Sequence, residues 1–236
     1  MKISIIIPIF NEELTILKVL KKIKEVQDNI QGDFEILVVN DGSTDDTNKI
    51  LKENKNLYDK LINININLGK GNAINEGFKS STGDIIIIQD ADLEYNPEEY
   101  QKLLTPFQKY NADVVFGSRF RSSEINRVLF FWHSIANKFI TLTSNVFSDL
   151  NLTDVETGYK VFKKDIIKKI NIEEKRFGFE IEITHKIANL KPKPKIFEVG
   201  ISYNGRTYEE GKKIGIKDAF RAMYCIIKFG FIKKFF

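Results

Sequence analysis

In the first half of the chain, runs of β-branched residues alternate with segments of helical periodicity, and this alternation restricts the fold more than any other feature. The run over residues 2–9 is rich in isoleucine, as expected of a strand that is covered on both faces in a parallel sheet. Further strands are predicted over 34–39, 84–89 and 113–117. The segment 62–68 alternates apolar residues with asparagine, which indicates a half-buried strand near an edge of the sheet.

Helices are predicted between these strands. Apolar residues recur at helical spacing over 14–26, and N-capping residues favour a helix over 47–54. Two more helices are expected over 72–80 and over 97–110, the latter with a proline suited to the first turn. Strands that alternate with helices predict an α/β fold, with a doubly wound, mostly parallel sheet that has helices on both faces.

Two amphipathic helices are expected in the second half of the chain. The first covers residues 131–146 and carries an apolar stripe whose partner the sequence leaves undetermined. The second, near the C-terminus, has an apolar row of Ile216, Phe220, Met223 and Ile227 beside a basic row of Lys217, Arg221 and Lys228. This pattern is typical of a helix in a membrane interface, and equally of a helix that docks on the protein's own sheet.

Composition limits the class of protein. With 236 residues, of which 42% are hydrophobic and 29% charged, the chain can form a substantial core and is not expected to be intrinsically disordered. Its longest apolar stretch, residues 128–132, is far shorter than the ~20 residues of a membrane-spanning helix. A secretory signal pattern is missing, and the single cysteine, Cys225, excludes an internal disulfide. We therefore expect a cytoplasmic protein.

The formal net charge of +4 hides an asymmetry between two parts of the chain. Acidic residues outnumber basic ones in 1–159, whereas residues 160–236 hold 19 Lys and Arg against nine Asp and Glu. The basic part is expected to attract an anionic partner, and nucleic acid, an anionic membrane surface and a phosphorylated substrate are all candidates by charge alone. A solvated, Lys-rich face is the alternative.

Several candidate residues lie at the carboxyl ends of predicted strands. They are Pro8, Asn40, Asp41, Asp90 and Asp92. Because the carboxyl ends of parallel strands meet at one edge of the sheet, where such folds bind ligands, these residues should gather there. Asp90 and Asp92 repel each other at this spacing, and Mg²⁺ or Mn²⁺, which prefer oxygen ligands, would relieve the repulsion. A solvated turn with a helix N-cap at Asp92 is the alternative.

Two common nucleotide-binding motifs are missing from the sequence. The segment Gly69-Lys70-Gly71 lacks the spacing of a Walker loop, which disfavours a kinase or an ATPase. The turn after the first strand lacks the glycine pattern of dinucleotide oxidoreductases, and a nucleotidyltransferase is disfavoured because it usually has a Gly-rich loop there. Lys70 is a candidate for contact with a donor's phosphates, with packing at a helix start as the alternative.

Taken together, five segments make the chain resemble the inverting nucleotide-sugar glycosyltransferases of family two, whose nucleotide-binding fold is called GT-A. These segments are residues 8–13 (PIFNEE), 40–43 (NDGS), 67–71 (NLGKG), 90–94 (DADLE) and 117–119 (GSR). Three later segments, 154–162 (DVETGYKVF), 176–180 (RFGFE) and 205–213 (GRTYEEGKK), resemble the soluble branch related to dolichyl-phosphate mannose and glucose synthases. Enzymes of that branch transfer a sugar from a nucleotide to a polyprenyl phosphate.

The resemblance implies a role for each matching residue at the donor end. The nucleotide would be bound by Pro8, Phe10, Glu12, Asp41, Lys70 and Asp90. Asp41 would accept hydrogen bonds from the base, and Asp90 would face the nucleotide and ribose. Asp92 would bind the metal, Mg²⁺ or Mn²⁺, and is the first catalytic candidate. Glu94 stands where some relatives carry a glutamine ligand, so Asp90, Asp92 and Glu94 form the expected metal set.

At the acceptor end, the resemblance implies a phosphate. Such an acceptor is already anionic near neutral pH, so it needs positive charge more than a base that removes a proton. Arg119, directly after a strand, suits this role through its forked donors and is the second catalytic candidate. The expected acceptor-phosphate set is Arg119, His133, Arg206 and Lys212. The mannose synthases carry an arginine and a serine where Leu129 and His133 stand here, and a structural role on a helix flank is the alternative for His133.

The resemblance also implies how the chain is organised and what it binds. Residues 1–118 would form the nucleotide-sugar-binding half, and 119–236 the acceptor-binding half with a basic, membrane-interfacial C-terminal helix, in one continuous catalytic domain. The expected partners are a nucleotide sugar of the GDP-mannose or UDP-glucose type and a polyprenyl phosphate. The protein would bind peripherally to the cytoplasmic face of a membrane, and no nucleic-acid partner is expected.

Two other functions stay open at this point. Transfer to a glycan hydroxyl would need a base, for which Asp154 is the candidate. Alternatively, the chain is an inactive nucleotide-binding module that recruits partners to membranes through its basic C-terminal helix. The roles of Glu156 and Glu180 are also open, between contact with the sugar or acceptor and the closure of polar loops.

Overall fold

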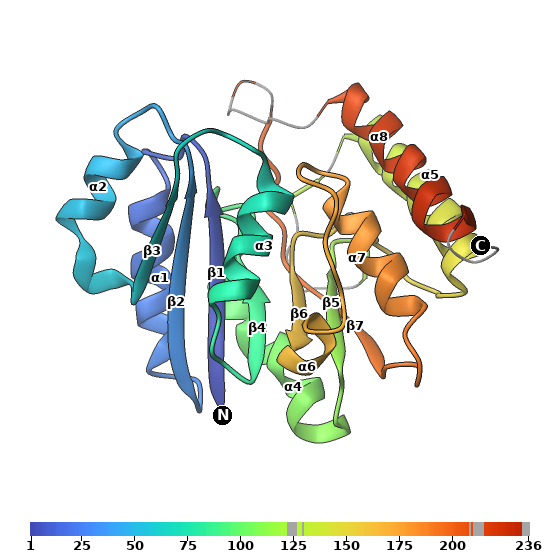
Figure 1. Ribbon diagram of the computed structural model, residues 1–236, viewed down its shortest axis with the longest axis horizontal. Coiled ribbons are helices and arrows are strands. Elements are labelled where there is room, and N and C mark those ends of the chain that lie inside the picture. The colour runs from blue at the N-terminus through green and yellow to red at the C-terminus, as the bar shows by residue number, and fades with distance from the viewer. Residues whose placement is uncertain (122–126, 129, 208, 210–214, 233–236) are drawn as a thin grey trace.

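A central sheet organises the structure, a computed structural model that describes residues 1–121, 127–128, 130–207, 209 and 215–232. Within these residues the sheet has seven strands in the order β3-β2-β1-β4-β6-β5-β7 (Figure 1). The strands are β1 (Lys2–Ile9), β2 (Asp33–Asp41), β3 (Lys60–Ile64), β4 (Ile85–Ile88), β5 (Val114–Ser118), β6 (Lys160–Lys163) and β7 (Ile196–Gly200). Only β6 runs antiparallel to its neighbours, β4 and β5. The predicted doubly wound, mostly parallel α/β sheet is confirmed.

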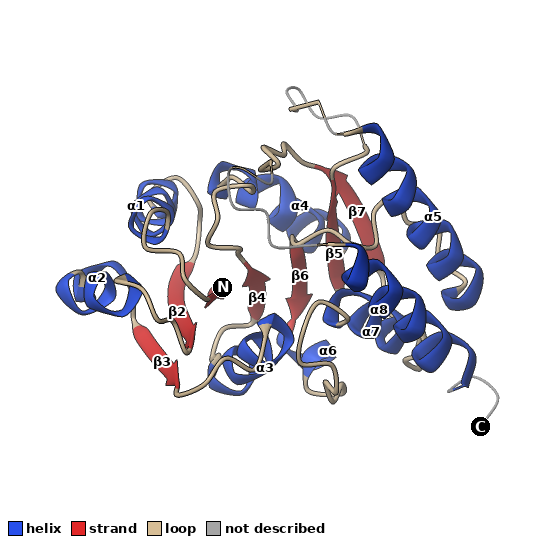
Figure 2. Ribbon diagram, turned by 90° about the horizontal axis from the view of Figure 1, so that it is seen from above, coloured by secondary structure: helices blue, strands red, loops and turns tan. Residues whose placement is uncertain are grey.

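Helices cover both faces of the sheet (Figure 2). One face is covered by α1 (Ile16–Gln27), α2 (Thr47–Glu53) and α4 (Tyr100–Tyr110). The other is covered by α3 (Lys70–Ser80), α6 (Lys164–Ile167), α7 (Phe179–Ala188) and α8 (Ile216–Ile226). The long helix α5 (Phe131–Ser148) packs against α7 and α8. Three short helical segments complete the list: η1 (Lys55–Leu57), η2 (Pro97–Glu99) and a π-helical turn, η3 (Ile227–Ile232).

Strand β1 shows why an isoleucine run produces a central strand. Its neighbours β2 and β4 are both parallel to it. Ile3, Ile5 and Ile7 are buried in the core on one face, whereas Ile6 is buried in the core on the other. Because successive side chains of a strand point to opposite faces, a strand covered on both sides needs apolar residues at every position.

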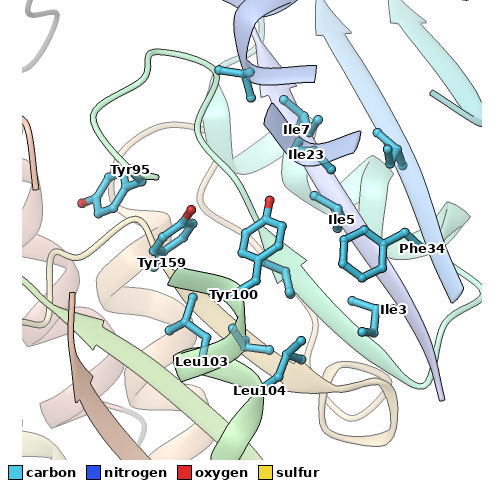
Figure 3. Close-up of a cluster of buried hydrophobic side chains, with 14 of the residues drawn as sticks. Ile3, Ile5, Ile7, Ile23, Phe34, Tyr95, Tyr100, Leu103, Leu104 and Tyr159 are labelled. Carbon is cyan, nitrogen blue, oxygen red and sulfur yellow. The ribbon is translucent and has the colours of Figure 1, made fainter. Parts of the chain in front are cut away.

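Aromatic side chains in the core between the sheet and helices α1 and α4 support the turn that follows β4 (Figure 3). The hydroxyl groups of Tyr100 and Tyr159 both donate to Oε1 of Gln89, at 2.8 and 2.7 Å. The Tyr95 ring lies 4.9 Å from that of Tyr159, and its hydroxyl accepts a hydrogen bond from the backbone of Gly158 at 2.8 Å. Since Gln89 directly precedes Asp90 and Asp92, these aromatic side chains fix the place where the two aspartates leave the sheet.

Some elements differ from the sequence-based expectation. The strand expected over 62–68 lies at the predicted edge of the sheet but ends at Ile64, because the following residues turn toward the end of β2. The helix expected over 97–110 begins as the 3₁₀ turn η2. Strand β6, helix α7 and strand β7 were not anticipated. Among the described residues, no helix is long and apolar enough to cross a membrane.

Candidate active site

A cavity of about 660 Å³ opens at the carboxyl ends of β1, β2, β4 and β5. Its walls are the loops after these strands, the start of α3, and parts of α5 and α8. The lining includes eleven predicted site residues: Pro8, Phe10, Glu12, Asp41, Lys70, Asp90, Asp92, Glu94, Arg119, His133 and Arg206. Lys212 and Leu129 lie outside the described residues. The structure thus brings every described residue of the expected nucleotide, metal and acceptor-phosphate sets to one cavity.

The loops after β1 and β2 hold each other at the expected donor end of the cavity. Oδ1 of Asn11 accepts a hydrogen bond from the backbone of Thr44 at 2.8 Å, and the backbone of Asn11 donates to Oγ of Ser43 at 3.0 Å. The backbone of Glu12 donates to Oγ1 of Thr47, also at 3.0 Å. The loop at residues 8–13 and the loop after β2 therefore form one continuous wall of the cavity.

Asp41 joins this wall to the loop before α3. Its side chain is buried; Oδ1 accepts a hydrogen bond from the backbone of Leu68 at 3.1 Å, and Oδ2 accepts one from Gly69 at 2.6 Å. Gly69 has a φ of +106°, a conformation that glycine adopts without steric cost. Each carboxylate oxygen keeps a second lone pair for a ligand, so the predicted contact with a nucleotide base stays a prediction.

The acidic turn after β4 is matched by two basic side chains. Nζ of Lys70 lies 2.8 Å from Oδ1 of Asp90 and 3.0 Å from Oε1 of Glu180. Burial alone would lower the pKa of Lys70, but the charges of these two carboxylates raise it well above its usual value. Nη2 of Arg206 lies 3.0 Å from Oδ2 of Asp92. Lys70 is therefore a fixed cation at the start of α3, beside the expected donor phosphates.

The carboxylate of Glu94 holds the loop that carries Arg206. The hydroxyl of Tyr203 donates to Oε2 of Glu94, and the backbone of Arg206 donates to Oε1, both at 2.8 Å. Both oxygens are thus committed to the loop after β7. The expected place of Glu94 in a metal set stays a prediction, and it would require one of these oxygens to serve a second partner.

The charges around Asp92 test whether a divalent metal fits. Burial and the charges of Asp90 and Glu94 raise the pKa of Asp92 to about 7, against the opposing effect of Arg206. Eight acidic side chains and four Lys or Arg side chains line the described part of the cavity. In the described chain, no three Asp, Glu, His or Cys side chains form a ready-made metal cluster. The donor chemistry and the excess negative charge fit Mg²⁺ or Mn²⁺, with Arg206 adjacent to Asp92.

Arg119 is fixed in the cavity wall by Asp154. Its Nε and Nη2 lie 2.7 Å from Oδ2 and Oδ1 of Asp154, and its backbone donates to the same carboxylate at 3.0 Å. The guanidinium carbon also lies 5.2 Å from the centre of the Tyr203 ring. Asp154 is fully buried, with both oxygens occupied. It therefore positions Arg119, and this arrangement disfavours Asp154 as the base for a hydroxyl acceptor.

His133 reaches the cavity from the first turn of α5. Its ring lies 5.6 Å from that of Phe130 in an edge-on arrangement, and its backbone carbonyl accepts a hydrogen bond from Asn137. Arg119, Arg206 and His133 thus line one cavity from three different elements. Their predicted contact with an acceptor phosphate stays a prediction.

Sequence reasoning missed Lys160 and Tyr203 as parts of the site. Lys160 is fully buried, and its Nζ donates to the backbone carbonyls of Val155 at 3.0 Å and Thr157 at 2.5 Å. Burial lowers the pKa of Lys160 to about 8. Lys160 is the first residue of β6, and its role could not be inferred because β6 was not recognised as a strand.

The sheet order and the acidic turn at its strand ends are those of a glycosyltransferase with a GT-A fold. The chain belongs to glycosyl transferase family 2, whose family model matches residues 4–171. This membership confirms the resemblance seen in the motifs.

Solved structures show the same fold. The chain is similar to glucosyl-3-phosphoglycerate synthase from Mycobacterium tuberculosis, solved in complex with Mn²⁺ and UDP-glucose, with a TM-score of 0.74 and 18% identity over 97% of this chain and 79% of that one. The structure of the same synthase without a named ligand gives a TM-score of 0.75 at 17% identity, over 97% of this chain and 80% of that one. At this identity, the likeness concerns the fold.

Three curated relatives cover most of the chain. An undecaprenyl-phosphate 4-deoxy-4-formamido-L-arabinose transferase of Proteus mirabilis is 28% identical over 89% of this chain and 62% of its own. A dolichol-phosphate mannosyltransferase of Pyrococcus furiosus is 28% identical over 91% and 61%. An uncharacterized protein of Methanocaldococcus jannaschii is 32% identical over 78% and 79%. The chain therefore spans about six tenths of the length of the first two relatives.

Proposed function

We propose that the protein is a metal-dependent, inverting glycosyltransferase that moves a hexose from a nucleotide sugar to a polyprenyl phosphate. The donor would be of the GDP-mannose or UDP-glucose type. One observation carries the proposal: Arg119, held by Asp154, faces the same cavity as the Asp90 and Asp92 carboxylates. Such a cavity offers a cation to an anionic acceptor beside a group of oxygen ligands for a donor's metal.

Residues at one end of the cavity are suited to bind the nucleotide-sugar donor. Lys70 would hold the diphosphate by charge, while Asp41 and the loops after β1 and β2 would hold the nucleoside. Asp92 and Asp90, with Glu94, would hold Mg²⁺ or Mn²⁺. When bound, the metal would neutralise negative charge on the leaving nucleoside diphosphate.

A phosphate acceptor suits the other end of the cavity. A phosphate monoester is already largely ionised near pH 7, so the attacking oxygen needs no base to remove its proton. Arg119 and Arg206 provide the forked donors that bind phosphate best. A hydroxyl acceptor would need a base, and the candidate for that role, Asp154, is engaged on both oxygens by Arg119. The names of the P. mirabilis and P. furiosus relatives support a polyprenyl-type acceptor.

A transfer assay tests this function. Purified protein is incubated with Mn²⁺, with labelled UDP-glucose or GDP-mannose, and with undecaprenyl or dolichyl phosphate, and the label that passes into the organic phase is counted. We expect label on the lipid phosphate and none on the corresponding polyprenyl alcohol. Transfer to free sugars alone would contradict the proposed acceptor. Nucleotide binding without any turnover would favour the inactive module.

The outer face of α5 supports a membrane role. Its buried residues include Thr141, Ser144 and Ser148, whereas large apolar residues point outward. These exposed side chains are Phe131, Trp132, Ile135, Phe139, Leu142 and Val146, each at least 43% exposed. A water-soluble helix normally has the opposite arrangement, so this face is suited to a second apolar medium.

The neighbouring helix α8 contributes to the same surface. It docks on the core through Ala222, Cys225 and Ile226, while Phe220, Tyr224 and Ile227 are at least 50% exposed. One face of this helix therefore docks on the protein's own core, and we propose the membrane interface for its exposed face. In the expected basic row, Arg221 pairs with Glu174 and Lys228 with Glu173, which leaves Lys217 and the apolar residues to face a membrane. We propose that α5 and α8 rest on the cytoplasmic face of a membrane.

Vesicle sedimentation tests this surface. The double variant Phe139→Ser/Leu142→Ser should lose most of its binding to vesicles of phosphatidylcholine with phosphatidylglycerol. Leu14→Ser is the matched control, because Leu14 is also strongly exposed but lies before α1. Equal binding by the double variant and the wild type would contradict the proposed surface.

A further inference from the structure

Two acidic side chains in the cavity carry oxygen atoms that the proposed donor and acceptor contacts leave unused. Glu180, at the start of α7, is only 6% exposed; its Oε1 lies 3.0 Å from Nζ of Lys70, whereas its Oε2 is buried without a hydrogen-bond partner among the described residues. Glu156, in the loop before β6, also lines the cavity, and within the described chain its carboxylate makes no hydrogen bond or ion pair. A buried acceptor that lacks a donor destabilises a protein unless a ligand supplies one.

Lys160 fixes the backbone on both sides of Glu156. Its ammonium group holds the backbone carbonyls of Val155 and Thr157, immediately before and after Glu156. The charges that act most on Glu156 are those of Glu180 and Arg119. Glu156 therefore shares the cavity with Glu180, which pairs with Lys70, and with Arg119.

In the proposed reaction, the transferred sugar lies between the two phosphate sites. Its anomeric carbon has to lie between the leaving diphosphate and the attacking acceptor oxygen for an inverting displacement. Lys70 marks the first of these places and Arg119 the second. The hydroxyl groups of a hexose placed there would meet the unused oxygens of Glu156 and Glu180.

We propose that Glu156 and Glu180 form the subsite for the transferred sugar, accept hydrogen bonds from its hydroxyl groups, and exclude sugars that carry a carboxylate. This inference rests on the proposed function, because it takes the cavity to be a nucleotide-sugar site. Hydroxyl groups donate well to carboxylates. A uronic acid would place a further negative charge beside the carboxylates of Glu156 and Glu180, which is unfavourable in a cavity shielded from bulk water.

Binding measurements on variants of Glu156 test the subsite. Isothermal titration with Mn²⁺ compares UDP with UDP-glucose, and GDP with GDP-mannose, in the wild type and in Glu156→Ala. The affinity for the nucleoside diphosphate should change less than twofold, whereas the nucleotide sugar should bind at least fivefold more weakly. Glu53→Gln, on the exposed end of α2, is the control for a lost carboxylate and should change neither affinity.

A second arm measures the exclusion of carboxylates. The uronate is UDP-glucuronate or GDP-mannuronate, matched to the nucleotide that the wild type binds better. The wild type should bind the uronate at least tenfold more weakly than the neutral sugar, and Glu156→Gln should reduce this ratio at least threefold. Should Glu156→Ala not fold, the ratios for Glu156→Gln and Glu180→Gln decide the question.

The outcomes separate the inference from the function on which it rests. A wild type that binds a nucleotide sugar while both Glu156 variants keep its affinities would overturn the subsite alone. Equal loss of nucleoside diphosphate and nucleotide sugar in Glu156→Ala would also overturn it, because the role would then be structural. A wild type that binds neither UDP nor GDP with Mn²⁺ would overturn the proposed function and the subsite together.

Discussion

The side chain of Arg119 is held by Asp154 through two parallel contacts of 2.7 Å, Nε to Oδ2 and Nη2 to Oδ1. Asp154 is held in turn by β7, because Oε1 of Glu198 accepts hydrogen bonds from the backbones of Thr153 and Asp154. A guanidinium held on one edge can present its remaining donors to a ligand without losing rotamer freedom on binding. Asp154 thus preorganises Arg119 to bind an anion.

Replacing Asp154 tests this positioning role. Asp154→Asn should raise the acceptor KM about tenfold or more, since loss of one buried charge-paired partner typically costs about 3–5 kcal/mol. Some transfer should remain, because the asparagine removes no proton-accepting group that a phosphate acceptor needs. Steady-state kinetics with varied polyprenyl phosphate measure the effect, and Asp165→Asn in the exposed pair with Lys168 is the control. Complete loss of transfer would instead favour a hydroxyl acceptor.

Arg206 should compete with a metal for Asp92. Its guanidinium lies 3.0 Å from Asp92 and 3.6 Å from both Glu12 and Glu94. Removal of this charge in Arg206→Gln should tighten Mn²⁺ binding roughly tenfold, given the size of charge interactions near a protein surface. The acceptor KM should rise in the same variant. Electron paramagnetic resonance of free Mn²⁺ gives the affinity, and an unchanged or weaker affinity would argue against competition.

Glu35 should make stability depend on pH in the acid range. Burial alone would raise its pKa, but hydrogen bonds from Ser4, Thr82 and Lys2 lower it from 4.5 to about 2. Because the folded-state pKa is depressed, its stabilisation is fully present above pH 4.5 and is lost as the pH falls toward 2.

The matched variant is Glu35→Gln. It should lower the free energy of unfolding by about 1–2 kcal/mol at pH 7, after allowance for solvent screening. The difference from the wild type should shrink between pH 4.5 and 2, as followed by urea denaturation. A difference that stays constant over this range would contradict the assignment.

Gly71 should tolerate no side chain. A Cβ there would lie 2.2 Å from the carbonyl oxygen of Glu174 and 3.0 Å from that of Arg176, so the loop before α7 or the start of α3 would have to shift. Gly71→Ala should therefore destabilise the protein by about 1–3 kcal/mol, the usual cost of overpacking. Gly215→Ala is the control, since a Cβ there meets nothing within 4 Å. Equal melting temperatures for the two variants would contradict this.

The sequence was most informative where a strand is long and covered on both faces. The isoleucine runs of β1 and β4 admit one interpretation, because such runs are typical of central parallel strands. Strand β6 has only four residues, and helix α7 buries charged Glu180 and Glu182 along with its apolar side chains. Neither element shows a clear period, so both escaped prediction.

Some residues of the candidate site could be predicted from the sequence, and others could not. Residues directly after strands could be placed together because parallel strands end at one edge, and Asp41, Asp90 and Arg119 do line one cavity. The contact of Arg206 with Asp92 joins residues 114 positions apart, and that of Lys160 with the loop at Glu156 depends on a buried rotamer. Such contacts depend on tertiary packing, which periodicity does not encode.

The central claim is that the acidic turn after β4 receives a nucleoside diphosphate together with a divalent metal. Isothermal titration of UDP and GDP into the wild type and Asp92→Asn, each with Mn²⁺ and with EDTA, tests it most directly. We predict that one of the two nucleotides binds the wild type at least tenfold more tightly with Mn²⁺ than with EDTA, and that Asp92→Asn loses this difference. Equal affinity with and without the metal in the wild type, or an undiminished metal effect in Asp92→Asn, would contradict the account.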